Sequence, residues 1–186
     1  MNILLRPSIH RYLHKTVHIL IIALVILFGF RAFLLEPSVT DGRSMEPTLV
    51  DHDFVFTNKW ALLFREPRRG EMVQIRQTQL NEVVIKRIIG LPGERVKLKN
   101  GDVYILDAFG NEERLTEPYL NESEKTFSTA DTNMVSAVLL PHQYYVLGDH
   151  RTQSTDSRAF GPVHRSSIYG TVLSLPFLNK RENKTP

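Results

Sequence analysis

Ser44 is the first residue whose surroundings suggest chemistry. It stands in the segment Gly42–Leu49, with a glycine two residues before it and a proline three residues after it. Such residues favour a turn that can expose a hydroxyl, although serines in such turns often serve the turn alone. A serine becomes a nucleophile only beside a proton acceptor, commonly a histidine or a neutral lysine. Four histidines in the second part of the chain keep the first option open: His52, His142, His150 and His164.

Lys86 is the alternative base, and it lies inside the apolar run Val83–Ile89. Because alternate residues of a strand share a face, Val84, Lys86 and Ile88 would point the same way. Burial among such neighbours disfavours the ammonium form and lowers the pKa of a lysine, which would make it a usable base. The opposite interpretation is an edge strand whose lysine faces water. Position alone favours this second interpretation.

A third group of polar residues follows the apolar strand predicted at 144–147. Two acids, two arginines and two serines stand within the eleven residues 148–158. Asp156 and Arg158 could pair, and Asp149 could hold either Arg87 or Arg151. The segment is therefore interpreted either as a self-bonded surface loop or as a support for a neighbouring site.

Residues 17–35 are apolar apart from His18 and Arg31. This length is enough to cross about 30 Å of hydrocarbon as a helix. A cleaved signal peptide and a buried or interfacial helix are the competing interpretations. The absence of an Ala-x-Ala site after the apolar run favours an uncleaved anchor. Basic residues before the span and acidic residues after it predict a cytoplasmic N-terminus and an outer domain, by the positive-inside rule.

The remaining sequence predicts a mainly β domain. Turn residues separate seven β-like runs, and Asn100-Gly101 between two of them indicates a type I′ hairpin. The seven runs are Phe54–Thr57, Glu71–Arg76, Val83–Ile89, Arg95–Lys99, Val103–Leu106, Tyr144–Leu147 and Ile168–Leu173. Residues 107–141 are polar and weakly patterned, which indicates an inserted excursion. We expect a cytoplasmic N-terminus (1–16), a transmembrane anchor (17–35), an outer domain (36–179) with a small inserted subdomain at about 96–142, and a tail (180–186).

Composition excludes several function classes. The 186 residues contain no cysteine, which rules out disulfides, a thiol nucleophile and a Cys-ligated metal centre. The net charge is +3. Residues 1–35 contain four basic residues and no acid, so the rest of the chain is close to neutral. A nucleic-acid-binding surface is not expected from this distribution.

Four motifs, read together, resemble those of type I signal peptidases, the membrane-anchored serine proteases that remove signal peptides from exported proteins. They occur in family order behind one N-terminal span, and only residues 107–141 lie outside the resemblance. The motifs are Ser44-Met45-x-Pro47-Thr48-Leu49, Arg69-Gly70-Glu71-x-Val73, the nine residues Lys86–Glu94, and Gly148-Asp149-x-Arg151-x-x-Ser154-x-Asp156-Ser157-Arg158.

The resemblance implies a signal-peptidase-like β-fold and a Ser–Lys dyad without metal or cofactor, in which Ser44 is the nucleophile and Lys86 the general base. Ser154 would hydrogen-bond Lys86, and the backbone N–H of Ser44 would stabilise the oxyanion. Met45 belongs to the nucleophile motif, and Gly42 stands where some members carry a further hydroxyl donor. A second departure is His150, where the family usually has asparagine. The residues expected to brace the last loop are Asp149, Arg87, Asp156 and Arg158.

The resemblance also implies a location and partners. Exported preproteins with Ala-x-Ala sites would be the substrates, at the outer face of the plasma membrane. The apolar segment Trp60–Phe64 is interpreted either as ordinary core or as a loop that contacts the lipid bilayer. A specialised protease for a few surface substrates, or a factor of this kind that has lost catalysis, is the alternative. Retention of both Ser44 and Lys86 argues against lost catalysis.

Overall fold

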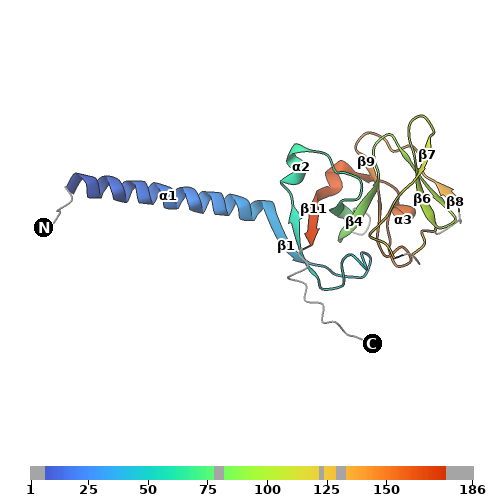
Figure 1. Cartoon of the computed structure of the whole chain (residues 1–186), viewed down its shortest axis with the longest axis horizontal. Coiled ribbons are helices and arrows are strands. Elements are labelled where there is room, and N and C mark those ends of the chain that lie inside the picture. The colour runs from blue at the N-terminus through green and yellow to red at the C-terminus, as the bar shows by residue number, and fades with distance from the viewer. Residues whose placement is uncertain (1–6, 78–81, 122–123, 129–132, 175–186) are drawn as a thin grey trace. The chain divides into compact units, whose positions relative to one another are not determined.

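The structure is a computed structural model that describes residues 7–77, 82–121, 124–128 and 133–174. It divides into two compact units, residues 1–36 and residues 37–186. The first contains helix α1 (Pro7–Leu34), drawn in blue in Figure 1. In the second, strands are the main regular structure, as the sequence predicted. The predicted tail at 180–186 lies outside the described residues, and the predicted domain boundaries remain predictions.

Helix α1 is, within the described part of the chain, the one helix long and apolar enough to cross a membrane. Its most apolar 18 residues are Tyr12–Gly29. Helix α1 ends at Leu34 and Leu35 is the first residue of strand β1, so the helix stops one residue before the predicted end of the span at 35, whose membrane bounds remain a prediction. Pro37 explains the early end, since a proline disfavours helical geometry in the residues that lead into it.

Within the described residues, seven strands form the main sheet. Their spatial order is β1 (Leu35–Val39), β2 (Phe54–Asn58), β11 (Ile168–Ser174), β3 (Met72–Gln77), β4 (Glu82–Gly90), β9 (Gln143–Leu147) and β10 (Val163–His164). The pairings of β2, β3, β4, β9, β10 and β11 with one another are antiparallel. Strand β4 thus lies between β3 and β9, well inside the sheet.

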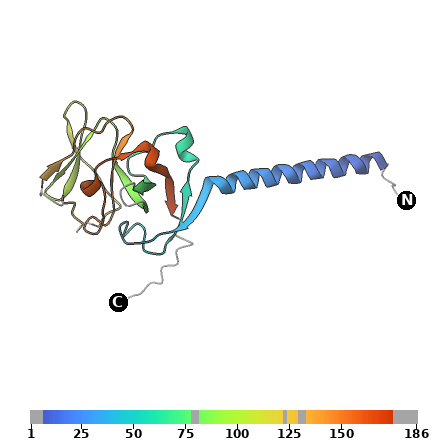
Figure 2. The same cartoon turned by 180° about the vertical axis from the view of Figure 1, so that it is seen from behind.

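A second, four-stranded sheet contains β7 (Glu112–Arg114), β6 (Asp102–Leu106), β5 (Arg95–Lys99) and β8 (Asn133–Val135), in that order. Strands β5 and β6 meet at the predicted hairpin, where Asn100 and Gly101 both have positive φ. The described part of the second unit also has three short helices: α2 (Ala61–Phe64), α3 (Ser157–Phe160) and the 3-10 helix η1 (Arg165–Ser167). Both views place α2 beside β11 (Figures 1 and 2).

Alternation along β4 and β9 explains how the core positions the site. Ile88 and Val146 belong to one buried apolar cluster, while their neighbours Ile89 and Leu147 belong to another that includes β5 and β6. Both faces of β4 are therefore covered near its C-terminal end, where residues 86–90 are all buried. Any polar side chain at this end of β4 has to find its partners inside the protein.

Candidate active site

Two buried apolar side chains hold the turn that carries Ser44. Met45 and Leu49 are almost fully buried and pack in one cluster with Val55 and Val172. Gly42 has a φ of 95°, a value that glycine adopts without strain, and its N–H donates to Asp51 Oδ1 at 2.9 Å. Burial of the side chain that follows Ser44 therefore leaves the serine itself half-buried at the surface of the turn.

Lys86 meets Ser44 directly. The side chain of Lys86 is 3% exposed, and its Nζ donates a hydrogen bond to Ser44 Oγ at 2.7 Å. The edge-strand interpretation of Lys86 is wrong, because β4 pairs with both β3 and β9. Burial away from water lowers the pKa of Lys86 to about 8. The carboxylates of Asp156 and Asp149 oppose this shift, and the guanidinium of Arg158 adds to it.

The positions of the four candidate histidines decide between the two bases that the sequence left open. Among the described side chains, the hydrogen bond to Ser44 Oγ comes from Lys86. His52, His142 and His164 are exposed, and His150 directs Nδ1 to the carbonyl oxygen of Arg43 at 3.3 Å. Of the two bases that the sequence left open, the structure therefore brings the lysine to the serine.

Arg87, the neighbour of Lys86, is held in a buried ion pair. Its Nε and Nη2 donate to the two carboxylate oxygens of Asp149 at 2.8 and 2.5 Å, and Asp149 is fully buried. Thr48 Oγ1 donates to Asp149 Oδ2 at 2.5 Å. This two-point pairing links the nucleophile turn, β4 and the loop after β9. Asp149 thus holds Arg87, whereas Arg151 pairs elsewhere.

Asp156 and Arg158 brace the same loop from its other end. The Nε and Nη2 atoms of Arg158 donate to the two carboxylate oxygens of Asp156, at 2.8 and 2.7 Å. Asp156 Oδ2 also accepts the backbone N–H of Gly148 at 3.0 Å, and Oδ1 accepts that of Arg158 at the start of α3. The loop that begins at Gly148 is therefore closed on itself by a buried carboxylate.

Ser154 lies beside the dyad candidates but does not make the expected bond to Lys86. Its Oγ is buried and has no hydrogen-bond partner among the residues that the structure describes. It packs against Gly148, where an added Cβ would come within 2.1 Å of Ser154 Oγ and 2.5 Å of the Ser44 carbonyl oxygen. Ser154 and the Ser44 carbonyl group thus fill the space beside Gly148. Lys86 Nζ donates its hydrogen bond to Ser44 Oγ and not to Ser154 Oγ.

A buried ion pair that the sequence did not reveal joins the segment between β7 and β8 to the loop after β9. Arg151 is 2% exposed and donates through both Nη atoms to the carboxylate of Glu117, with one bond at 3.0 Å. The ring of Tyr119, two residues after Glu117, lies 3.9 Å from the guanidinium carbon of Arg87. Glu117 and Tyr119 belong to the weakly patterned segment, and no spacing in the sequence marks them as partners of residues 87 and 151.

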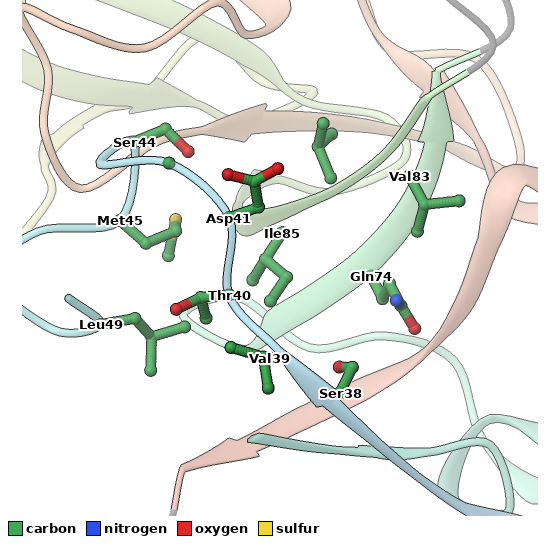
Figure 3. A pocket seen from close by; sticks show the side chains of 12 residues that line it. Ser38, Val39, Thr40, Asp41, Ser44, Met45, Leu49, Gln74, Val83 and Ile85 are labelled. Atoms are coloured by element: carbon green, nitrogen blue, oxygen red, sulfur yellow. The ribbon is translucent and has the colours of Figure 1, made fainter. Parts of the chain in front are cut away.

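A cleft of about 150 Å³ opens beside Ser44. One wall is the segment 38–44, and the other comes from β4 with Val83, Val84 and Ile85. Figure 3 shows Ser44 and Asp41 at one end of this segment and Ser38 at the other, with Ile85 and Val83 facing them. Met45 and Leu49 close the cleft below the serine.

The geometry is that of a serine hydrolase. It combines an accessible hydroxyl, a buried amine with a depressed pKa within hydrogen-bond distance, and a cleft next to both. Within the described residues no three histidine or carboxylate side chains gather to hold a metal ion.

Comparisons with known proteins give the family. The model of the family "Signal peptidase, peptidase S26" matches residues 13–176. A signal peptidase I from Bacillus amyloliquefaciens is 37% identical over 172 residues, which cover 89% of each chain. Signal peptidase IB from Staphylococcus aureus is 35% identical over 179 residues, covering 89% of this chain and 91% of the relative. A solved signal peptidase I from Enterococcus faecalis V583 is 28% identical, with a TM-score of 0.47, and covers 57% of this chain and 97% of that one.

These matches define the class as a serine peptidase, and in this chain it carries an N-terminal helix long and apolar enough to cross a membrane. More particularly, the chain belongs to the signal peptidase family, peptidase S26, and has signal peptidase I function. The resemblance of the four motifs is thereby confirmed at the level of the family.

Proposed function

We propose that this chain removes signal peptides from exported preproteins, with Ser44 as the nucleophile and Lys86 as the general base. The observation that carries the proposal is the 2.7 Å hydrogen bond between Lys86 Nζ and Ser44 Oγ, made by a lysine that is almost fully buried. A buried amine with a pKa of about 8 is neutral in about a tenth of the molecules at pH 7 and in about half of them at pH 8. It can therefore accept the hydroxyl proton without help from a histidine.

The reaction follows from this pair. Ser44 Oγ attacks the scissile carbonyl carbon as its proton passes to Lys86 Nζ, and the backbone N–H of Ser44 donates to the resulting oxyanion. When the C–N bond breaks, Lys86 returns the proton to the leaving amine, and an ester on Ser44 remains. A water molecule then attacks the ester carbonyl carbon while Lys86 accepts a proton from it. As the bond between this carbon and Ser44 Oγ breaks, Lys86 returns the proton to Oγ and the new carboxyl terminus of the cleaved peptide leaves.

The cleft supports cleavage after small residues. The several residues of an extended peptide would have to share its volume of about 150 Å³. Buried Met45 and Leu49 close the cleft next to Ser44. Side chains of alanine size fit such a space, whereas a large side chain would meet the packed core. Ala-x-Ala sites are the substrates we propose on this basis.

We further propose that α1 is the membrane anchor, with the N-terminus in the cytoplasm and the catalytic unit outside. The positive charges of the first residues support this orientation through the positive-inside rule. A preprotein crossing the same membrane would then present its cleavage site on the side where Ser44 lies.

The test is cleavage of a preprotein that carries an Ala-x-Ala site by the full chain in lipid or detergent, between pH 5.5 and about 9. We expect cleavage, with kcat/KM falling about tenfold per pH unit below about 8, because Lys86 accepts a proton as the pH drops through its pKa. The rate at each pH would be measured from the processed fraction.

The matched control is the same preprotein with both alanines replaced by phenylalanine, which should not be cut. A rate that stays constant from pH 6 to 9 would contradict Lys86 as the base. An intact Ala-x-Ala preprotein at every pH would favour the alternative, a factor specialised for a few surface substrates or one without catalysis.

Three large apolar side chains around α2 support a contact with lipid. Trp60, Leu63 and Phe64 are 40%, 67% and 72% exposed, whereas Leu62 between them packs in the core. The rings of Trp60 and Phe64 lie 4.8 Å apart and form one patch. We propose that this patch rests in the membrane interface, where amphipathic aromatic rings are favoured.

Trp60 offers a direct test because it is the only tryptophan of the chain. In liposomes, brominated acyl chains should quench its fluorescence, since the indole would lie within the interface. The double variant Leu63→Ser/Phe64→Ser should lower this quenching, and Phe109→Ser, which changes an exposed phenylalanine on the β6–β7 connection, should not. Equal emission in brominated and ordinary lipid would contradict the lipid contact and would mean that Trp60 faces water.

A further inference from the structure

His150 contacts the nucleophile turn through both its backbone and its side chain. Its backbone N–H donates to the carbonyl oxygen of Ser44 at 3.1 Å. Its Nδ1 lies 3.3 Å from the carbonyl oxygen of Arg43, the residue just before the nucleophile. The same carbonyl accepts the backbone N–H of Glu46, also at 3.1 Å. The two peptide units that flank Ser44 are therefore tied to a single residue of the loop after β9.

The side-chain contact fixes where the imidazole carries its proton. A carbonyl oxygen only accepts hydrogen bonds, so Nδ1 must be the protonated nitrogen for the contact with Arg43 to attract. Glu46 Oε2 lies 3.8 Å from Nδ1 and favours a proton on that atom. Glu46 is itself held by the guanidinium of Arg43, through bonds of 2.9 and 3.0 Å. Glu124 lines the cavity beside His150 and adds a second negative charge on this side.

The position of the loop end that carries His150 is rigid. Asp149 on one side is buried and paired with Arg87, and Arg151 on the other side is buried and paired with Glu117. The imidazole itself is 18% exposed, so it is partly withdrawn from water. A donor on such a fixed support can define the orientation of the peptide unit that it contacts.

We propose that the imidazole of His150 is a positioning residue that holds the Arg43 carbonyl and so keeps Ser44 Oγ at Lys86 Nζ. It touches neither the substrate nor the reacting atoms, and it acts through the turn. The inference rests on the proposed roles of Ser44 and Lys86. Without the side-chain bond, the Ser44 turn keeps its apolar anchors and its backbone bonds, but the hydroxyl has more freedom to leave the lysine.

Asparagine provides a chemical test of this role. Its amide nitrogen is attached to Cγ, as Nδ1 of histidine is, so it can present an N–H to the same carbonyl. Leucine has a similar size but no donor. Both variants keep the backbone N–H of residue 150, so they differ in the side-chain bond alone.

The experiment measures kcat and KM of the full chain for an Ala-x-Ala preprotein. His150→Leu should lower kcat roughly 10- to 100-fold with KM changed less than about threefold, since small misplacement of a nucleophile acts on the chemical step. His150→Asn should keep kcat within about threefold of the parent. His142→Asn, at an exposed histidine on the turn before β9, is the control and should leave both constants unchanged.

Glu46→Gln gives a second reading that does not depend on the folding of the leucine variant. It should lower kcat more in the parent, where the carboxylate favours the proton on Nδ1, than in His150→Asn, whose amide always carries its protons. Equal losses in both backgrounds, full kcat in His150→Leu, or a loss confined to KM would each overturn the inference. A parent chain that cuts no preprotein would instead overturn the proposed function, and this inference with it.

Discussion

Replacing Ser44 by alanine should lower kcat for preprotein cleavage by about 10⁴-fold or more, because no covalent intermediate can form. The cleft is lined by the segment 38–44, Met45, Leu49 and β4. The variant loses the hydrogen bond between Ser44 Oγ and Lys86 Nζ, but the buried side chains of Met45 and Leu49 still hold the turn. KM and the free energy of unfolding should therefore change little. Cleavage would be followed by the appearance of the mature fragment, and folding by chemical denaturation.

Ser166→Ala is the matched control, because this serine is exposed on η1 and should not affect cleavage. Ser44→Ala activity above about 1% of the parent would contradict the nucleophile assignment. A loss of folding in Ser44→Ala would contradict the view that Met45 and Leu49, rather than the hydroxyl, hold the turn.

The strands of the domain were predictable because their apolar residues alternate over four or more positions. All seven predicted strands occur, and they correspond to β2, β3, β4, β5, β6, β9 and β11. The strands that were not predicted are short or atypical. Strand β7 is Glu-Glu-Arg with every residue exposed, and β10 has only two residues. Pairing with a neighbour, rather than local pattern, makes these segments strands.

The burial of Lys86 could not be read from its own strand. An apolar run with one lysine fits both an edge strand and a central strand. The difference depends on β9, which begins more than fifty residues later and pairs with β4 on the side away from β3. The order of strands in a sheet is a property of the whole fold, so the local sequence supported the wrong interpretation.

The residues that support the site also divide into pairs that the sequence suggested and pairs that only the structure shows. The Asp156–Arg158 pair joins residues two positions apart, and the sequence suggested it directly. The Glu117–Arg151 pair joins a weakly patterned segment to the loop after β9, and no local signal marks it. Gly148 stands within a recognised motif, but only the structure shows that its missing side chain makes room for Ser154 and the Ser44 carbonyl.

Replacing Lys86 by methionine should lower kcat by about 10³-fold or more while leaving the domain at least as stable at pH 7. The side chains have similar length, so the buried space stays filled. The ammonium form of Lys86 is disfavoured by burial, which is why its pKa falls from 10.5 to about 8. Methionine removes this unfavourable burial, so activity and stability should change in opposite directions.

The pH dependence of stability separates this explanation from simple damage to the fold. Below pH 8 the lysine is protonated in both the folded and the unfolded chain, and the folded state bears the full cost of burying it. Between pH 8 and 10.5 the unfolded chain binds more protons, so the stability of the parent rises with pH. The gain relative to Lys86→Met should reach about 3 kcal/mol across this window.

Denaturation curves of the parent, Lys86→Met and Lys99→Met between pH 7 and about 10.5 would measure this gain. Lys99 is exposed on β5, so its variant should follow the parent at every pH. Ser44→Ala should also follow the parent, because it removes the hydrogen bond of Lys86 but keeps the buried amine. A parent curve parallel to that of Lys86→Met would mean that the lysine is solvated in the folded chain. The lysine could not then be the neutral base, and the 2.7 Å contact with Ser44 would join a hydroxyl to an ammonium ion that cannot accept its proton.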